Sequence, residues 1–577
     1  NPLNTNFAFS NAVLGVFSQY TETDQFRKTQ NRQWWSEWYG QDTWQLNSRM
    51  TFDYGLRFLL YSPYERPDGQ VSNFDPSVFD PAQAPRLYYP ATVNGVKVGL
   101  DRATGQTVNQ VYVGTFVPGT GDPANGFVKE TDPGVPMGFR KILPPQPEPR
   151  VGFTWDLGGA GTTVLHSSAG LFHQARLGGG SLGNLAANPP FIHNPVVFNG
   201  TMGTLFSQGL TLSDRPSTVE ALETSYKTPS SYNWSVGLRR EIGWGTAVDA
   251  TYTGYASRNM EMYYDLNAVP DGARNVALHP ENADPTNPST ALADDFLRPY
   301  RGVGSIRVRG NSASGDSHML QVQVNRRYIH GVQFGAAYTL QRSRGYADED
   351  PGNLSTSLNR PPSWYFGELA QSNRQSLIIN YSWDLPTGSR GVLNNTLGRL
   401  IFDGWQISGE NDFVTGDWAD VILTTSDNFD FTGGTAGNGG CLAGNDPCAH
   451  VVRPVLAGDP MAGGGDPLTG WFNTAAFARP SGFGDYGNAP RNVVEKPGVV
   501  NWNLALFKNF AAGGHRSFQF RAEAYNVLNH TEFQDIDRTA RFDPTGKQIN
   551  PTFGTAIGIA SPTRSPRTIQ LSARFNF

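Results

Sequence analysis

The chain has 577 residues and a formal net charge of −5, and only 16% of its residues are charged, against roughly 25% in ordinary soluble proteins. The chain has no excess of basic residues that would bind nucleic acid, so we expect no nucleic-acid partner. No run approaches the ~18 apolar residues of a transmembrane helix, but 65 glycines and 12% aromatic residues suit short strands and long loops.

Apolar and polar residues alternate with a period of two in many segments, which predicts amphipathic β-strands. We expect about 14 strands, the first near residues 11–22. After the first strand, the alternation is clearest at residues 50–60, 151–157, 232–238, 320–324, 332–340, 377–383, 500–506 and 518–524. The last alternating segment, RTIQLSARFNF at 567–577, alternates at every position from Thr568 and ends on Phe577.

The connections between these strands are either very short or very long. The short ones lie at 47–48, 158–161, 243–245, 329–331 and 511–514, and the long ones at about 63–147, 174–229, 258–315, 345–372, 417–497 and 529–565. Loops of compact domains usually have about 4–6 residues, whereas outer-membrane barrels have short periplasmic turns and long extracellular loops. We therefore predict an all-β fold, a transmembrane antiparallel up-and-down β-barrel over 1–577 that is incomplete at its N-terminus, in the outer membrane of a Gram-negative bacterium.

The two registers of each strand differ in polarity. A charge that faces the bilayer midplane costs about 2–4 kcal/mol, so the polar register should face the lumen. The expected lumen-facing residues are Arg57, Arg239, Gln321, Gln323, Arg521, Glu523 and Arg574. The expected interface aromatics are Trp34, Trp35, Trp38, Trp44 and Trp234. The alternative is that aromatic residues fill a soluble core.

The two cysteines, Cys441 and Cys448, lie in one loop rich in Gly, Asn and Pro. We prefer a local disulfide, as found in an oxidising compartment, and two free thiols are the alternative. The acidic stretches 426–431 and 348–350 could hold calcium through oxygen ligands. We prefer to interpret them as solvated acidic loop residues, and no cofactor is expected.

The sequence predicts no enzyme active site. GGGSLG at 178–183 has the spacing of a nucleotide-binding turn, but no helix follows it, so we interpret it as a loop. The nine histidines show no HExxH or other zinc spacing, and no nucleophile elbow is present.

Several segments resemble the TonB-dependent outer-membrane receptors, specifically their Oar-like barrels. They are EWYGQDTWQLNSRMTFDYGLRF (37–58), PRVGFTWDLGGAGTTVLHSSAGLFH (149–173), LQVQVNRRYIHGVQFGAAYTLQRS (320–343), GWQISGENDFVTG (404–416), WFNTAAFARP (471–480), NWNLALFKNF (501–510), RAEAYNVLNHTEF (521–533) and the final strand. The resemblance implies a barrel of roughly 22 strands preceded by a plug. The plug, the TonB box and the first barrel strands have no counterpart in this sequence.

The resemblance also implies a function. Extracellular loops would capture a substrate, which then passes through a lumen gated by the plug. The implied partners are outer-membrane lipids, the TonB complex if the intact protein carries a plug and a TonB box, and a surface lipoprotein or other outer-membrane protein. The final strand would be read as an assembly signal through Ile569, Leu571, Phe575 and Phe577. The alternative function is a structural or interaction barrel, or a passive pore, without energised transport.

Overall fold

The computed structural model describes residues 3–25, 30–174, 184–205, 213–346, 355–357, 362–391, 394–429, 431, 452–511, 516–559 and 566–577. Cys441, Cys448 and the segments 178–183 and 348–350 lie outside these residues. No helix in the described part of the chain is long and apolar enough to cross a membrane.

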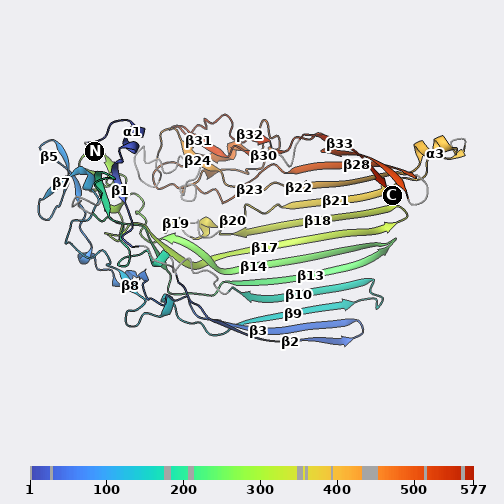
Figure 1. The fold of residues 1–577 in the computed structure, drawn as a ribbon, viewed down its shortest axis with the longest axis horizontal. Helices are drawn as coiled ribbons and strands as arrows, with labels where there is room; N and C mark the ends of the chain where they lie inside the picture. Colours follow the sequence, from blue (N-terminus) through green and yellow to red (C-terminus); the bar gives the residue numbers. More distant parts are fainter. Residues whose placement is uncertain are drawn as a thin grey trace.

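One antiparallel sheet dominates the structure, and its thirteen main strands pair in chain order (Figure 1). These strands are β2 (Trp35–Asn47), β3 (Met50–Tyr61), β9 (Gln146–Asp156), β10 (Thr163–His173), β13 (Ser230–Gly243), β14 (Thr246–Asp265), β17 (Ile306–Ile329), β18 (Val332–Gly345), β21 (Gln375–Asp384), β22 (Trp405–Val414), β28 (Val499–Ala511), β29 (Ser517–Tyr525) and β33 (Thr568–Asn576). The order confirms the up-and-down β fold. In the described residues β2 and β33 form its two edges.

The strand expected near 11–22 does form, as β1 (Val16–Thr21), but its place in the barrel was predicted wrongly. β1 pairs with β11 (Val196–Thr201), which belongs to the connection between β10 and β13, and not with the main sheet. The segment forms a strand because the loop strand β11 supplies its pairing partner.

Connections of the main sheet are sorted by length, as predicted. Figure 1 shows the long connections at the left end of the strands and the tight turns at the right end, next to the C-terminus. The β17–β18 turn has two residues, His330 and Gly331, both with positive φ, which matches the twist of the flanking strands. The long connections run over 62–145, 174–229, 266–305, 346–374, 415–498 and 526–567.

One connection at the turn end is not short. Residues 385–404 join β21 to β22 and carry the helix α3 (Thr396–Phe402), which extends past the strand ends in Figure 1. No pattern in the sequence predicts this segment, because it lacks the alternation of a strand and is shorter than the long loops.

The long connections fold into small elements of their own. The strands are β4 (Ser72–Phe74), β5 (Tyr89–Val93), β6 (Val96–Leu100), β7 (Thr107–Asn109), β8 (Phe127–Lys129), β12 (Val219–Leu222), β15 (Ala283–Asp284), β16 (Asn287–Ala291), β19 (Ser355–Ser357), β20 (Gly367–Glu368), β23 (Trp418–Ala419), β24 (Ile422–Thr425), β25 (Val455–Leu456), β26 (Phe477–Ala478), β27 (Val494–Glu495), β30 (Phe533–Ile536), β31 (Thr539–Phe542) and β32 (Ala556–Ile559). The helices are α1 (Ala8–Val13) and the 3-10 turns η1 (Pro76–Val78), η2 (Pro81–Gln83), η3 (Gln110–Tyr112), η4 (Met137–Phe139), η5 (Pro280–Asn282), η6 (Asp294–Phe296), η8 (Pro362–Tyr365) and η12 (Thr474–Ala476).

The hydrophobic cores lie among these loops. The largest joins the connections 415–498 and 526–567, which we call the loop module. Its buried residues include Phe472, Phe477, Ile536, Phe542 and Phe553. In it β24 runs parallel to β31, so two connections far apart in sequence form one folded unit.

Candidate functional site

The main sheet has one continuous polar face. Directly paired residues of neighbouring strands lie on the same face of a sheet, so the register can be followed from strand to strand. It places the seven polar residues singled out in the sequence on this one face: Arg57, Arg239, Gln321, Gln323, Arg521, Glu523 and Arg574.

Several charges on this polar face are paired. Arg57 forms ion pairs with Glu37 and with Glu148, whose Oε2 lies 3.6 Å from the Arg57 Nε. Arg150 Nη2 lies 3.5 Å from the same Glu148 oxygen. At the other edge of the sheet, Arg521 Nη2 lies 3.1 Å from Glu523 Oε1. The polar face therefore carries both signs of charge.

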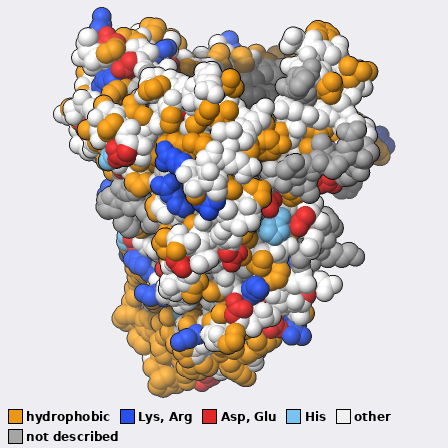
Figure 2. Space-filling view, turned by 90° about the vertical axis from the view of Figure 1, so that its left-hand side faces the viewer, with side chains coloured by type: hydrophobic (Ala, Val, Ile, Leu, Met, Phe, Trp, Pro, Cys, Tyr) orange, Lys and Arg blue, Asp and Glu red, His pale blue; other side chains and the backbone are white. Residues whose placement is uncertain are grey.

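The opposite face is apolar and exposed. Trp38, Trp44 and Trp234 lie on it by register, and Trp34 directly precedes β2. Trp35 lies on the polar face. It pairs with Tyr61 and is three positions from Trp38, so the two tryptophans project on opposite faces of β2. Figure 2 shows hydrophobic side chains gathered at the bottom of the molecule, where Figure 1 has β2 and β3. A face of this kind suits lipid.

The final strand shows the same two faces. Ile569, Leu571, Phe575 and Phe577 project on the apolar face, and Phe577 is 95% exposed. The rings of Phe575 and Phe577 stack with their centroids 6.2 Å apart. Arg574 lies on the polar face, paired with Gln519.

A polar cavity of about 410 Å³ lies among the long loops. Three successive connections line it: 62–145 with Phe116 and Phe127, 174–229 with His193 through Val219, and 266–305 with Asp295 through Ser305. Thr21, at the end of β1, adds to the wall. The β1–β11 pairing thus places the N-terminal segment beside this cavity.

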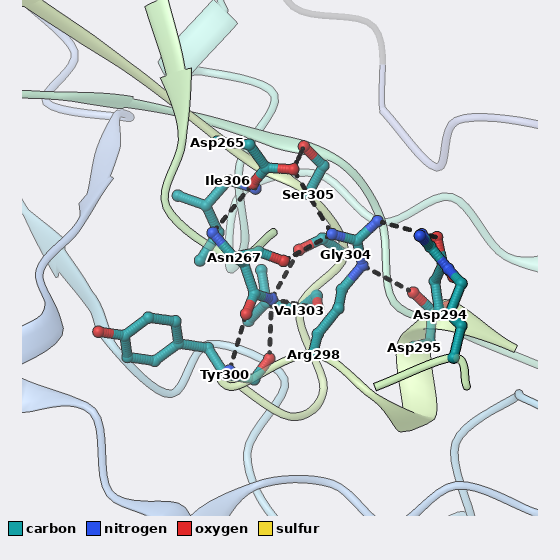
Figure 3. A network of polar contacts seen from close by, with 11 residues as sticks. Asp265, Asn267, Asp294, Asp295, Arg298, Tyr300, Val303, Gly304, Ser305 and Ile306 are labelled. Carbon is teal, nitrogen blue, oxygen red and sulfur yellow. Dashed lines mark hydrogen bonds and ion pairs between the residues drawn. The ribbon is translucent and has the colours of Figure 1, made fainter. Parts of the chain in front are cut away.

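A buried asparagine shapes the wall of the cavity (Figure 3). Asn267 is fully buried, and its Nδ2 lies 3.0, 2.9 and 2.8 Å from the carbonyl oxygens of Tyr300, Val303 and Gly304. Its Oδ1 accepts a hydrogen bond from the Tyr300 amide. Asp265, at the end of β14, accepts from the Ile306 amide and the Ser305 hydroxyl. These bonds fix the wall segment 300–306.

Arginines hold the acidic part of the cavity together. Arg298 lies 3.5 Å from a carboxylate oxygen of Asp265 and 3.5 Å from one of Asp295, and it also approaches Asp294 (Figure 3). Arg274 donates two hydrogen bonds of 2.9 Å to Asp294. Three carboxylates thus share two guanidinium groups.

These surroundings shift the carboxyl pKa values apart. Burial raises the pKa of Asp295, and the nearby Arg298 offsets only part of that rise. Burial acts on Asp294 in the same direction, but the hydrogen bonds and charge of Arg274 outweigh it, so the pKa of Asp294 is lowered. Of the two, Asp295 lines the cavity, whereas Asp294 lies behind the lining and binds Arg274.

The rest of the lining also carries both charges. His193 and Asp214 line one side, with 3.9 Å between Nδ1 and Oδ2, and Arg215 follows directly. Phe116 and Phe127 supply apolar surface. A small polar ligand with hydroxyl or charged groups fits this lining. The described residues contain no group of three or more His, Cys, Asp or Glu placed to hold a metal ion.

Sequence reasoning missed this cavity. Its residues come from three loops without periodicity, and only their contacts bring them together. The acidic stretch at 426–431 lies elsewhere, where Asp427 forms an ion pair of 2.8 Å with Arg479.

Comparison with known proteins gives one family. A family model described as outer membrane beta barrel domain matches residues 1–570. No curated protein matches the chain.

Solved structures that match this chain include one transporter and two receptors. They are the outer membrane transporter YddB from Escherichia coli (9% identity, TM-score 0.37, 94% of this chain and 53% of that chain), the siderophore receptor PiuA from Acinetobacter baumannii (7%, 0.37, 94% and 43%) and a mutant of the ferric enterobactin receptor PfeA from Pseudomonas aeruginosa (10%, 0.36, 94% and 53%). The chain spans about half the length of these proteins.

Proposed function

This chain belongs to the outer membrane beta barrel domain family and lies in the outer membrane of a Gram-negative bacterium, and from this premise we propose that it is the barrel of a TonB-dependent receptor of the Oar-like kind. Its extracellular loops capture a substrate, and the substrate passes along the polar face through a lumen that a plug gates. The plug and the contact with TonB belong to the intact protein.

One observation supports this proposal above the others: the polar cavity lies among the loops at the long-loop end of the polar face. In an outer-membrane barrel that end is extracellular. A substrate captured there would next meet the paired charges of Arg57, Glu148 and Arg150 on β3 and β9. Paired charges bind polar cargo weakly, which favours passage over retention.

The cavity points to a small polar cargo. Its volume of about 410 Å³ falls within the 300–1,000 Å³ range of ordinary ligand sites. Asp214 and Arg215 offer opposite charges on one wall, and Phe116 offers an apolar surface for a ring. Sugars, short peptides and small metal chelates with exposed carboxylates share these features.

Uptake measurements test this function. A strain that lacks the gene is complemented with the full-length gene or with its Arg215→Ala variant and offered labelled ferric siderophores, oligosaccharides and short peptides. We expect TonB-dependent accumulation of one class, lowered by Arg215→Ala and unchanged by Lys97→Ala, a control at an exposed position of β6. Accumulation that persists without TonB, together with ion conductance in planar bilayers, would indicate a passive pore instead.

A structural or interaction barrel is the second candidate, and the loop module favours it. The module has its own hydrophobic core, which a pore does not need. Removal of residues 452–495 would separate the two functions, because an interaction barrel loses cell-surface binding whereas a receptor keeps its TonB dependence.

A further inference from the structure

The helix α3 at the turn end presents an apolar stripe to its surroundings. Leu397, Leu400 and Ile401 follow the i, i+3, i+4 spacing that places side chains on one helix face. They are 65%, 52% and 47% exposed, and the adjacent Phe402 is 44% exposed. Only Gly398 of this helix is buried. The apolar stripe therefore faces away from the protein.

Two side chains hold α3 on the apolar side of the barrel wall. Trp405 of β22 and Lys508 of β28 pair with each other in register. They lie on the apolar face, on the same side of the sheet as the pair Ile407 and Leu506. The Trp405 indole N–H donates to the Ile401 carbonyl at 2.7 Å, and the Lys508 ammonium donates to the same carbonyl at 3.2 Å. The C-terminal end of α3 thus lies against the lipid-facing surface.

The position of Lys508 is otherwise hard to explain. It is a cation on the apolar face, only 4% exposed, with its Nζ 4.9 Å from the centre of the Trp405 ring and 5.3 Å from that of Phe510. It also donates to the Asp403 carbonyl. Carbonyls at a helix C-terminus carry partial negative charge, and a lysine there stabilises the helix end. Lys508 therefore fixes the place of α3.

The charges around α3 complement a phospholipid surface. Arg390 and Arg399 are exposed on this connection. Asp403, an acidic residue of the same segment, accepts hydrogen bonds from the amide and the hydroxyl of Ser389. Exposed apolar residues beside cations are the composition of helices that lie in a membrane interface.

We propose that α3 is an interfacial helix whose Leu397, Leu400 and Ile401 insert into the periplasmic leaflet of the outer membrane, continuous with the lipid-facing surface of the barrel. Lys508 and Trp405 hold it there, and Arg390 and Arg399 face the phosphates. A second protein in the periplasm is the competing occupant, and continuity with the apolar face favours lipid. This inference does not depend on whether the barrel transports anything.

Spin labels measure the depth of each helix face. In a background with Cys441→Ser and Cys448→Ser, the full chain is labelled at Leu400→Cys or at Arg399→Cys and reconstituted into vesicles of phosphatidylethanolamine and phosphatidylglycerol. We expect the ratio of oxygen collisions to nickel-chelate collisions to be several-fold higher at 400 than at 399, because position 399 lies on the opposite side of the helix.

Two further measurements decide the assignment. Lys508→Met, which keeps the length and apolar contacts of the side chain, should remove the oxygen preference at 400 while strand content and the heat-dependent gel shift stay unchanged. Equal, water-like ratios at 399 and 400 in vesicles overturn the proposal. A label at 400 that is water-accessible in vesicles and immobilised only in isolated outer membranes also overturns it, in favour of a protein partner.

Discussion

At the scale of single residues, the loops depend on a few buried polar side chains. Asn267 satisfies three carbonyls of the cavity wall with one amide group. Asp101 binds Arg86 through both oxygens, at 3.1 and 2.9 Å, and also accepts from the Thr104 hydroxyl at 2.8 Å. Neither role could be predicted from sequence, because Asn and Asp are the commonest residues of solvated turns.

Asn267→Ala should loosen the cavity wall. Each buried polar group left without a partner costs about 1–3 kcal/mol. This change removes the hydrogen-bond donor of the Tyr300, Val303 and Gly304 carbonyls. We expect the hydrogen-exchange protection of residues 300–306 to fall and that of β17 below them to remain. Asn287→Ala, at an exposed hairpin, is the control, and an equal loss in both variants would contradict this role.

Asp101 should make the β5–β7 sheet sensitive to acid. The hydrogen bonds from Arg86 lower the pKa of Asp101 from 3.8 to about 2. A depressed carboxyl pKa stabilises the fold above pH 3.8, and this stabilisation is lost as the pH falls towards about 2. We expect hydrogen-exchange protection factors of residues 89–109 to drop several-fold over that window. Asp101→Asn should be less protected at neutral pH and show no such drop.

At the scale of elements, the two faces of a strand decide its place. The final strand keeps Arg574 on the polar face and four apolar residues on the other. Trp35 shows where this reasoning stops, since two consecutive tryptophans cannot both lie on one face of a strand. The strand at 16–21 shows another limit, because a period of two does not identify the partner.

The end of the last strand should control assembly of the barrel. Phe577 is 95% exposed, so it contributes little to the stability of this chain alone. We expect deletion of Phe577 to lower the amount of folded barrel in the outer membrane, measured by the heat-dependent gel shift. Phe577→Trp, which keeps an aromatic end, should assemble normally, and unchanged assembly after the deletion would rule out a signalling role.

At the scale of the whole molecule, the loop module has a hydrophobic core of its own, and we expect it to unfold separately from the main sheet. Phe542 is 1% exposed in the module core. Truncation of a buried Phe costs about 3–5 kcal/mol, so Phe542→Ala should make the connections 415–498 and 526–567 sensitive to external protease. The sheet should keep its gel shift. Leu468→Ala, at an exposed position, is the control, and loss of the gel shift in Phe542→Ala would show that the two units fold together.

The sequence by itself determined the strands, their two faces and the sorting of turns from loops, because alternation and connection length are local properties. Only the tertiary structure decided that β1 joins a loop, that α3 lies against the apolar face and that three loops enclose a cavity. These depend on contacts across long separations, such as the bond from Asn73 to the Leu222 carbonyl across 149 residues. No local pattern encodes such a pairing, since side chains of many kinds can satisfy a buried carbonyl.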